Sequence, residues 1–292
     1  MYNELIQPYI KTYLDELGKS QMAEIIEYSL KDGKCLRGFI VKHIMNVLSQ
    51  GKVDLWEPVV AVEIIQATSL ILDDLPCMDN DKVRRSKVCT HIKFGECESI
   101  LTSYYMCSQV AKLLSKTITS LKQTNIKLTK EDISKVNDTY NVISQNFSEK
   151  LVLGQLLDLS KDVHKMFNYK IDPDEIDIVT VIYKTSSLFS ICFALGGSIG
   201  MLYDKEIELG DFEIMGKSFG IMFQIMDDFK DFEQDKDGYN FVRRIGKEKA
   251  IEIYNENKDE FKSLLKKNKL YTKEFKKLIS FVDTRLKNNY DN

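Results

Sequence analysis

Several features are scarce in this chain, and each scarcity argues against a class of protein. Only four prolines and 14 glycines occur in 292 residues, and no sustained alternation of apolar and polar residues lies between turn pairs such as Asn-Gly. Such a sequence does not favour a sheet-based fold. The six cysteines form no CxxC pair and no zinc-like spacing, which indicates reduced thiols that fill the core. With three histidines, the chain also shows no Ser/His or Cys/His constellation for nucleophilic catalysis.

Net charge of one sign is scarce as well. There are 41 basic and 44 acidic residues, for a net charge of −3, so nucleic acid is a poor first guess for a partner. The opening stretch MYNELIQPYIKTYLDELGKS is amphipathic and carries acids, which predicts a first helix rather than a signal or transit peptide. We therefore expect a cytoplasmic location. Residues 185–203 carry no charge, but their serines and glycines favour a close-packed buried helix, so we expect no transmembrane segment.

Apolar residues recur instead at the three- and four-residue spacing of helices, for example at Ala61, Ile64, Ile65, Thr68 and Leu72. The string Asp-Pro-Asp-Glu at 172–175 is a helix start, with aspartate as the N-cap and proline in the first turn. Polar breaks are predicted near residues 51–54, 121–131, 160–170, 203–208 and 235–239, but none is long enough to be a domain linker. We therefore predict an all-α chain that forms one helical domain over residues 1–292.

Two clusters of aspartates end apolar helical runs, ILDDLPCMDND at 71–81 and IMFQIMDDFKD at 221–231. Buried carboxylates are costly unless they are paired or bind a metal. In the second cluster, Asp227 and Asp231 share one helix face, while Asp228 lies about 100° round. Two such carboxylates repel each other, and a divalent cation turns that repulsion into chelation. A solvated acidic helix end is the alternative interpretation.

The first cluster adds fixed cations to the carboxylates. Pro76 breaks the helix after Asp73 and Asp74, so the chain has to fold back to bring Asp79 near them. Four basic residues follow within eight positions: Lys82, Arg84, Arg85 and Lys87. Acids beside fixed cations suit a magnesium–diphosphate site, because the metal bridges carboxylate and phosphate oxygens while arginines bind the remaining ones. The alternative is an acidic turn followed by a charged helix start.

The string DDLPCMDNDxxRR, with FQxxDDxxD downstream, resembles the trans-polyprenyl diphosphate synthases, the family of farnesyl and geranylgeranyl diphosphate synthases. Residues 154–159 (GQLLDL) resemble the family's GQxxDL helix, Lys184-Thr185 its KT motif, and Gly33-Lys34-x-x-Arg37 its GGKRxRP loop. The resemblance spans about residues 30 to 285. It implies an isoprenoid-synthase helical bundle around a central active-site cavity, and a homodimer packed through central helices.

The resemblance also implies roles for individual residues, with Mg²⁺ as cofactor and isopentenyl and allylic diphosphates as substrates. The implied magnesium ligands are Asp73, Asp74, Asp79, Asp227, Asp228 and Asp231. Arg84 is expected to contact the allylic diphosphate. The residues expected to hold isopentenyl diphosphate are Lys34, Arg37, Gln66 and Arg85. Lys184, Thr185 and Gln224 are expected to line the reacting carbon, where neutral oxygens can face a transient carbocation without quenching it.

Product length depends on the hydrophobic floor below the first aspartates. Each isoprene unit has five carbons, so burying one contributes on the order of 4 kcal/mol. Thr68 and Ser69 stand five and four residues before Asp73, where farnesyl-makers of the family usually carry an aromatic. These small residues favour a geranylgeranyl product. Tyr104 and Tyr105 are candidates for a deeper floor, with ordinary core or dimer packing as the alternative.

Some positions depart from the family pattern. Cys35 and Gly38 stand where arginine and proline are usual, and Ser103-Tyr104 replaces Gly-Asp. The usual Gly-Lys segment after the second cluster is missing; the candidates to replace its charge are Lys230, Lys236, Arg243 and Arg244.

The leading hypothesis is a prenyl diphosphate synthase that makes geranylgeranyl diphosphate. The competing ones are a farnesyl diphosphate producer, a catalytically poor regulatory subunit, a class I terpene cyclase and a generic helical interaction protein. The second aspartate cluster argues against the cyclase, which normally carries an Asn/Ser/Glu magnesium motif there.

Overall fold

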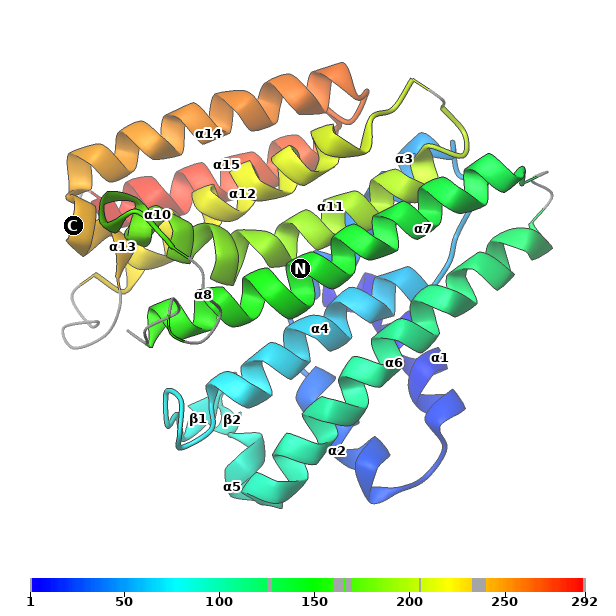
Figure 1. Cartoon of the computed structure of the whole chain (residues 1–292), viewed down its shortest axis with the longest axis horizontal. Helices are drawn as coiled ribbons and strands as arrows, with labels where there is room; N and C mark the ends of the chain where they lie inside the picture. The colour runs from blue at the N-terminus through cyan, green and yellow to red at the C-terminus, as the bar shows by residue number, and fades with distance from the viewer. Residues whose placement is uncertain are drawn as a thin grey trace. The chain divides into compact units, whose positions relative to one another are not determined.

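The chain is described here from a computed structural model, which covers residues 2–124, 128–159, 165, 170–204, 206–232 and 240–290. These residues are almost entirely helical, so the all-α prediction is confirmed (Figure 1). Extended structure among them is limited to a hairpin of two short strands, β1 (Val83–Arg84) and β2 (Lys87–Val88). The chain divides into two compact units, Met1–Tyr140 and Asn141–Asn292, which are described separately.

The first unit is built on one central pair of helices. Its helices are α1 (Asn3–Leu17), α2 (Gln21–Leu30), α3 (Leu36–Leu48), α4 (Glu57–Asp73), α5 (Thr90–Phe94), α6 (Glu96–Gln123) and most of α7 (Lys130–Ser144). Helices α4 and α6 lie side by side (Figure 1), and the Ser120 hydroxyl of α6 donates to Glu57 Oε1 at the start of α4 at 2.6 Å. Because the start of α4 meets the end of α6, the two helices run antiparallel.

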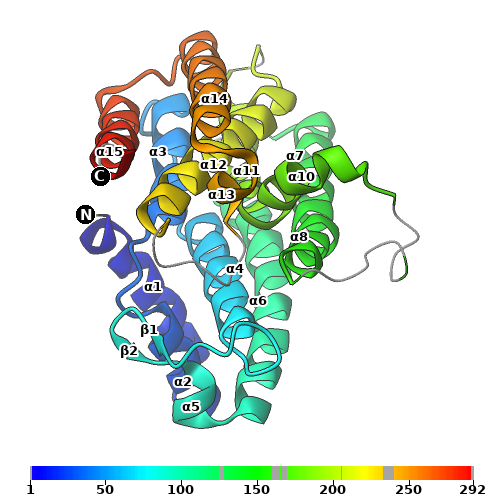
Figure 2. The ribbon, with the colours of Figure 1, turned by 90° about the vertical axis from the view of Figure 1, so that its left-hand side faces the viewer.

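The hairpin lies beside α2, as Figure 2 shows. The Tyr28 hydroxyl donates to the Val88 carbonyl at 2.8 Å, and Lys87 Nζ donates to the Tyr28 carbonyl at 3.3 Å. The carbonyl end of a helix carries partial negative charge, so a lysine there is favourable. This contact holds the basic strands against the end of α2.

The second unit is built around a helix with no exposed side. Its elements are η1 (Gln145–Lys150), α8 (Leu151–Asp158), η2 (Pro173–Glu175), α10 (Ile176–Val181), η3 (Ile182–Ser186), α11 (Ser187–Gly200), α12 (Leu209–Lys230), α13 (Phe241–Ile245), α14 (Lys247–Lys267) and α15 (Lys273–Tyr290). Every residue of α11 is buried. Helix α12 packs closely on it, because a Cβ on Gly216 would lie 2.7 Å from the Phe189 carbonyl carbon. The glycine therefore permits a backbone approach that alanine would block.

The stretch Pro173–Gly200, which contains α11, is long enough to cross a membrane and includes an 18-residue window that is apolar enough to do so, with a mean hydropathy of 1.7. Two thirds of that window is buried inside the protein, as expected for a core helix. Helices α12, α14 and α15 line up beside it in Figure 1. The aromatic contacts among Phe193, Phe219, Phe261 and Phe275 join these helices into one core.

The predicted helix start at 172–175 is present. The Asp172 side chain accepts a hydrogen bond from the Asp174 N–H at 3.0 Å, and Pro173 opens a short 3₁₀ turn that leads into α10. The predicted breaks at residues 51–54 and 203–208 also fall between helices. Most of the predicted break at 160–170 and all of that at 235–239 lie outside the described residues.

Candidate active site

The first aspartate cluster stands at the C-terminal end of α4. Asp73 is the last residue of this helix, and Asp74 is its C-cap. Beyond the break at Pro76 the chain turns back, so that the Asp79 N–H donates to the Asp73 carbonyl at 2.9 Å. The predicted return of the second acidic group is therefore observed. Asp73 is half-buried and Asp79 is exposed.

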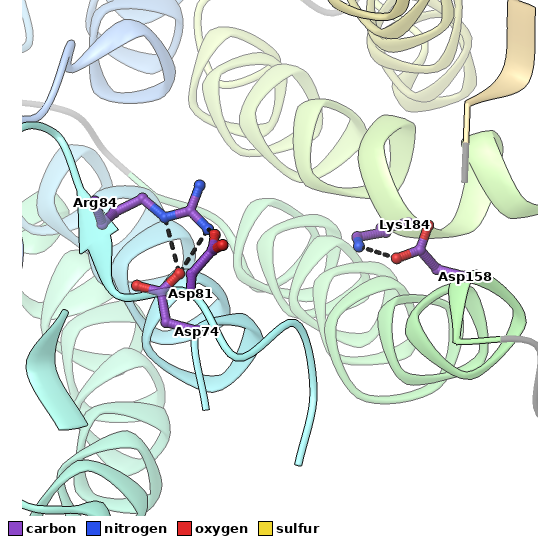
Figure 3. Close-up of polar contacts among 5 residues, drawn as sticks. All are labelled: Asp74, Asp81, Arg84, Asp158 and Lys184. Atoms are coloured by element: carbon purple, nitrogen blue, oxygen red, sulfur yellow. Dashed lines mark hydrogen bonds and ion pairs between the residues drawn. The ribbon is translucent and has the colours of Figure 1, made fainter. Parts of the chain in front are cut away.

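Arg84, on the following hairpin, is tied to this cluster. Its Nε and Nη2 atoms donate to Asp74 Oδ1 at 2.8 and 2.6 Å, and Nη2 also donates to Asp81 Oδ2 at 2.6 Å (Figure 3). Asp74 is 3% exposed and also hydrogen-bonds the buried Cys89 thiol. Burial and this hydrogen bond raise the pKa of the Cys89 thiol to about 12. Because Asp74 is buried and accepts two hydrogen bonds from the Arg84 guanidinium, it holds Arg84 in position.

Arg85 occupies the turn of the hairpin. Arg85 and Ser86 have φ values of 52° and 60°, the left-handed conformation that a two-residue turn of this kind requires. Neither residue is glycine, so the turn is locally strained. The Arg85 Nη1 atom donates to the Ser29 carbonyl at 3.3 Å and lies 3.2 Å from the position of a Cβ on Gly33.

The other residues predicted to hold isopentenyl diphosphate belong to the same unit. Lys34 follows Gly33 and is exposed, while Arg37 is half-buried in the first turn of α3. Gln66 lies on α4, and its Oε1 atom is buried with no hydrogen-bond partner among the described residues. A buried acceptor without a donor is costly, and such an atom is common where a ligand completes the hydrogen bonding.

The second cluster also stands at the C-terminal end of a helix. Asp227 lies in the last turn of α12, and the N–H of the C-cap residue Asp231 donates to its carbonyl at 3.0 Å. Asp231 Oδ1 accepts from Lys230 Nζ at 2.6 Å. Both aspartates are half-buried.

Asp228, which is also predicted to be a metal ligand, is held by donors of the protein. It is 5% exposed, its Oδ1 accepts from Gln224 Nε2 at 2.6 Å, and its Oδ2 accepts from the Phe241 N–H at 2.7 Å. The Asn240 side chain donates to its carbonyl at 3.0 Å. Asp228 therefore joins α12 to the start of α13 and faces protein donors with both oxygens.

Gln224 connects Asp228 to the KT motif. The Thr185 hydroxyl donates to Gln224 Oε1 at 2.6 Å, and Gln224 donates onward to Asp228. The order of donors is fixed by the carboxylate, which can only accept. The amide NH₂ must face Asp228, the amide oxygen must face Thr185, and the Thr185 hydroxyl proton is committed to Gln224. The lone pairs of Thr185 are then left for other neighbours.

Lys184 pairs with Asp158 at the end of α8 (Figure 3). Lys184 and Thr185 both stand in η3, a π-helical turn of the kind that is frequent at functional sites. Helix α8 approaches this turn closely, because a Cβ on Gly154 would lie 2.6 Å from the Tyr183 carbonyl carbon. The glycine of the GQLLDL string therefore permits the pairing of its aspartate with Lys184. Asp158 is a site residue that the sequence prediction missed, although the motif contained it.

The predicted chain-length positions have unequal surroundings. Thr68 is 2% exposed and its hydroxyl donates to the Ile64 carbonyl at 2.8 Å, while Ser69 is half-buried and donates to Gln66 O at 3.0 Å. Tyr104 is 79% exposed, which contradicts its placement in a buried floor, since α6 turns that face away from α4. Tyr105 is half-buried and lies near Tyr13 of α1.

Three of the cations considered for the missing Gly-Lys segment are described. Arg244 pairs with Asp177 of α10, Arg243 donates to the Phe232 carbonyl, and Lys230 pairs with Asp231. Lys230 thus contacts an aspartate of the second cluster. Lys236 lies outside the described residues.

The residues present fit Mg²⁺. Both clusters offer only oxygen donors, which suit this ion, and each stands where a helix C-terminus adds partial negative charge. Like charges at such an end are unfavourable unless a cation is bound. In the described part of the chain, no three His, Cys, Asp or Glu side chains converge on one point.

Comparison with known proteins identifies the class to which this fold and site belong. The sequence profile of the polyprenyl synthetase family matches residues 19–279. The farnesyl diphosphate synthase of Buchnera aphidicola (from Acyrthosiphon pisum) is 31% identical over 266 residues, 90% of this chain and 89% of that protein. The mitochondrial geranylgeranyl pyrophosphate synthase 10 of Arabidopsis thaliana is 31% identical over 213 residues, 72% of this chain and 58% of that protein. The crystal structure of a geranyltranstransferase from Thermotoga maritima superposes with a TM-score of 0.76 at 25% identity, covering 97% of this chain and 98% of that one.

The fold is that of isoprenoid synthases, and the class is that of trans-prenyltransferases. The chain belongs to the polyprenyl synthetase family. Enzymes of this family generally depend on Mg²⁺.

Proposed function

We propose that this enzyme condenses isopentenyl diphosphate with allylic diphosphates in the presence of Mg²⁺, and that its main product is geranylgeranyl diphosphate. The observation that carries the proposal is the pair of aspartate clusters, each at the C-terminal end of a helix. The first is followed directly by a hairpin that holds an arginine against it. A metal ion and the diphosphate of a substrate would satisfy these charges.

Each aspartate pair is proposed to bind Mg²⁺ together with oxygens of the allylic diphosphate, Asp73 with Asp79 and Asp227 with Asp231. When bound, the metal would stabilise negative charge on the departing diphosphate. Arg84 would bind a remaining phosphate oxygen through the face not used by Asp74. Its position is supported by the hydrogen bonds from Nε and Nη2, which leave the Nη1 end of the fork for a ligand.

The isopentenyl diphosphate group is proposed to bind Lys34, Arg37, Gln66 and Arg85. Support comes from the placement of Arg85, whose Nη1 atom lies 3.2 Å from the position of a Cβ on Gly33, the residue before Lys34. The positive charges of these residues suit a diphosphate that must be held but not cleaved. The double bond of isopentenyl diphosphate then attacks the allylic carbocation, and the released diphosphate takes the proton.

Thr185 is proposed to stabilise the carbocation with its lone pairs. Its proton is committed to Gln224, so the outer side of the hydroxyl oxygen is negative. Such an oriented dipole stabilises a cation without forming a covalent bond to it. Lys184, paired with Asp158, would lie beside the reacting carbon without adding uncompensated charge.

The geranylgeranyl product is favoured by the residues before the first cluster. Thr68 is buried and Ser69 half-buried, and neither has the bulk of an aromatic ring. The relatives include both farnesyl and geranylgeranyl synthases at similar identity, so the choice depends on these side chains. A farnesyl product is the second candidate, favoured by the half-buried ring of Tyr105.

The test is to incubate the protein with Mg²⁺, labelled isopentenyl diphosphate and, separately, dimethylallyl, geranyl and farnesyl diphosphates, and to chromatograph the dephosphorylated products. We expect a twenty-carbon alcohol. A fifteen-carbon alcohol would keep the activity and select the farnesyl candidate. No product from a folded protein that still binds Mg²⁺-diphosphate would refute the synthase and favour the regulatory subunit.

Asp73→Ala and Asp227→Ala should each abolish the condensation and leave the helical circular dichroism unchanged. Asp15→Ala is the matched control, because Asp15 is an exposed aspartate on α1 that pairs with Lys11 one turn away. Full turnover in both cluster variants would contradict the assignment of the two clusters to Mg²⁺.

A homodimer is proposed as well. Helix α6 exposes an apolar face in which Ile100, Leu101 and Tyr104 are 48%, 56% and 79% exposed. A patch of this kind is typical of an interface. Light scattering should give the Leu101→Asp/Tyr104→Asp double variant half the mass of the wild type. An unchanged mass would exclude this face as the dimer interface.

A cytoplasmic location stays a prediction, to be tested by cell fractionation.

A further inference from the structure

Glu63 is a buried acid on α4 to which the proposed reaction gives no role. It is 6% exposed and stands three residues before Gln66, on the same side of the helix. Its Oε1 atom accepts a hydrogen bond from the Gly38 N–H at 2.7 Å. That N–H belongs to the first turn of α3, where helix donors lack partners within the helix and where the dipole favours negative charge.

Two arginines lie within electrostatic reach of this carboxylate. Glu63 interacts electrostatically with Arg37, the residue before Gly38, and with Arg85 in the turn of the hairpin. Burial raises the pKa of the Glu63 carboxyl, whereas the Gly38 N–H and the two arginines oppose that rise. Burial also lowers the pKa of Arg85, and the charge of Glu63 opposes that change. The start of α3, the hairpin turn and α4 therefore meet at one buried charge.

The contact with Gly38 is a feature of this chain rather than of the family pattern. A proline, the usual residue at this position, has no N–H to donate. A side chain at position 38 would also crowd the acid, because a Cβ on Gly38 would lie 3.1 Å from Glu63 Oε1 and 3.2 Å from Ile6 Cγ2. The departure at Gly38 thus makes both the donor and the space that bring Glu63 to the start of α3.

We propose that Glu63 is a positioning residue for the subsite that binds the diphosphate of isopentenyl diphosphate, acting through Arg37 and Arg85. This inference rests on the proposed function. Two guanidinium groups directed at one diphosphate repel each other before the ligand arrives. A buried carboxylate bound to the backbone between their elements offsets that repulsion and keeps both groups oriented, which lowers the ordering cost of binding.

The test is Glu63→Gln, which keeps the shape and the acceptor for the Gly38 N–H but removes the charge. We expect the KM for isopentenyl diphosphate to rise about tenfold, the size expected when one oriented charged hydrogen bond is weakened. The KM for the allylic substrate and kcat should stay within about twofold, because neither arginine is assigned to the allylic diphosphate. Glu57→Gln is the matched control, a buried glutamate on the same helix whose Oε1 accepts from Ser120 at 2.6 Å. It should leave both KM values unchanged.

Calorimetric titration with isopentenyl diphosphate, without allylic substrate or metal, gives a readout that does not require turnover. Weaker binding to Glu63→Gln than to the wild type would support the inference even if no condensation occurred, in which case only the proposed function would fail. Unchanged or tighter binding would overturn it, because the acid would then merely reduce the positive charge of the subsite. The same substitution in an Arg85→Gln background should have a smaller effect than in the wild type, and an equal effect would exclude action through Arg85.

Discussion

Asp228→Asn is the substitution that separates the stability of the second unit from its chemistry. In the wild type, Asp228 accepts from both Gln224 and the Phe241 N–H. This fixes the direction of the hydrogen bonds that lead from Thr185 through Gln224 to Asp228. An asparagine can still accept from Phe241 with its oxygen, but its NH₂ then faces Gln224. The Gln224 amide must rotate so that its oxygen accepts, and its own NH₂ then donates to Thr185. No hydrogen bond is lost, but the Thr185 hydroxyl no longer donates to Gln224. Its oxygen instead accepts from the Gln224 NH₂, and its proton is free to point elsewhere.

The magnitudes follow from this geometry. The asparagine keeps every partner and loses only the charge of two hydrogen bonds, so it should cost about 1 kcal/mol of unfolding free energy. Asp228→Ala instead leaves two buried donors unsatisfied, at about 1–3 kcal/mol each, or about 4 kcal/mol together. For a unit of the size of Asn141–Asn292, about 2–4 °C of Tm corresponds to each kcal/mol. We therefore expect Tm to fall by about 2–4 °C for asparagine and by about 8–16 °C for alanine.

Asp228→Asn should affect activity much more strongly than it affects stability. With the Thr185 dipole reversed, its proton faces the carbocation, and kcat for Asp228→Asn should fall by about 10- to 100-fold despite the nearly intact fold. The assays are thermal unfolding by circular dichroism and initial rates at saturating substrates over a range of Mg²⁺ concentrations. An unchanged kcat would refute the assigned role of the Thr185 dipole. A large rise in the Mg²⁺ requirement would show instead that Asp228 is a metal ligand, as the aspartate motif predicts.

The remaining predictions concern single side chains. Thr68→Phe should shift the product to fifteen carbons and cost about 1–3 kcal/mol of stability through overpacking, which product chromatography and unfolding curves would check; an unchanged product would remove Thr68 from the floor. Gly154→Ala should lower Tm and kcat, since its Cβ would lie 2.6 Å from the backbone of η3, whereas Gly210→Ala, with nothing within 4 Å, should do neither. The Cys89 thiol, with its pKa raised from 9.0 to about 12, should carry about a thousandfold less thiolate at pH 8 than an ordinary thiol, so iodoacetamide should label the exposed Cys77 and Cys97 before Cys89. Labelling of Cys89 should rise with pH, and rapid labelling at pH 8 would contradict its burial.

Much of the fold was accessible from the sequence because the signals are local. Apolar spacing predicts a helix wherever a stripe of side chains must be buried, and it does so for α4 and α12 without reference to their neighbours. The return of Asp79 toward Asp73 follows from Pro76, since a proline there stops the helix within a few residues of the acids. These predictions need only one segment of chain at a time.

Asp228 and Tyr104 show where such reasoning ends. Each lies on a predicted helix, but which side of the helix is buried depends on rotation about its axis, and that rotation is set by contacts distant in sequence. Asp228 meets Phe241 across 13 positions, and Tyr104 is exposed because α6 packs on α4 through its other face. A motif names the residue type required, but it does not say whether a given carboxylate faces a ligand or a backbone N–H.

The order of the residues alone shows that the chain is helical, that it carries two aspartate clusters with basic segments beside the first, and that its motifs are those of a prenyltransferase. The folded chain was needed to show that Asp228 orders Gln224 and Thr185, that Asp158 pairs with Lys184, and that Glu63 meets Gly38 near two arginines. A hydrogen bond or ion pair depends on distance and direction in space, whereas periodicity and motif spacing report only distance along the chain.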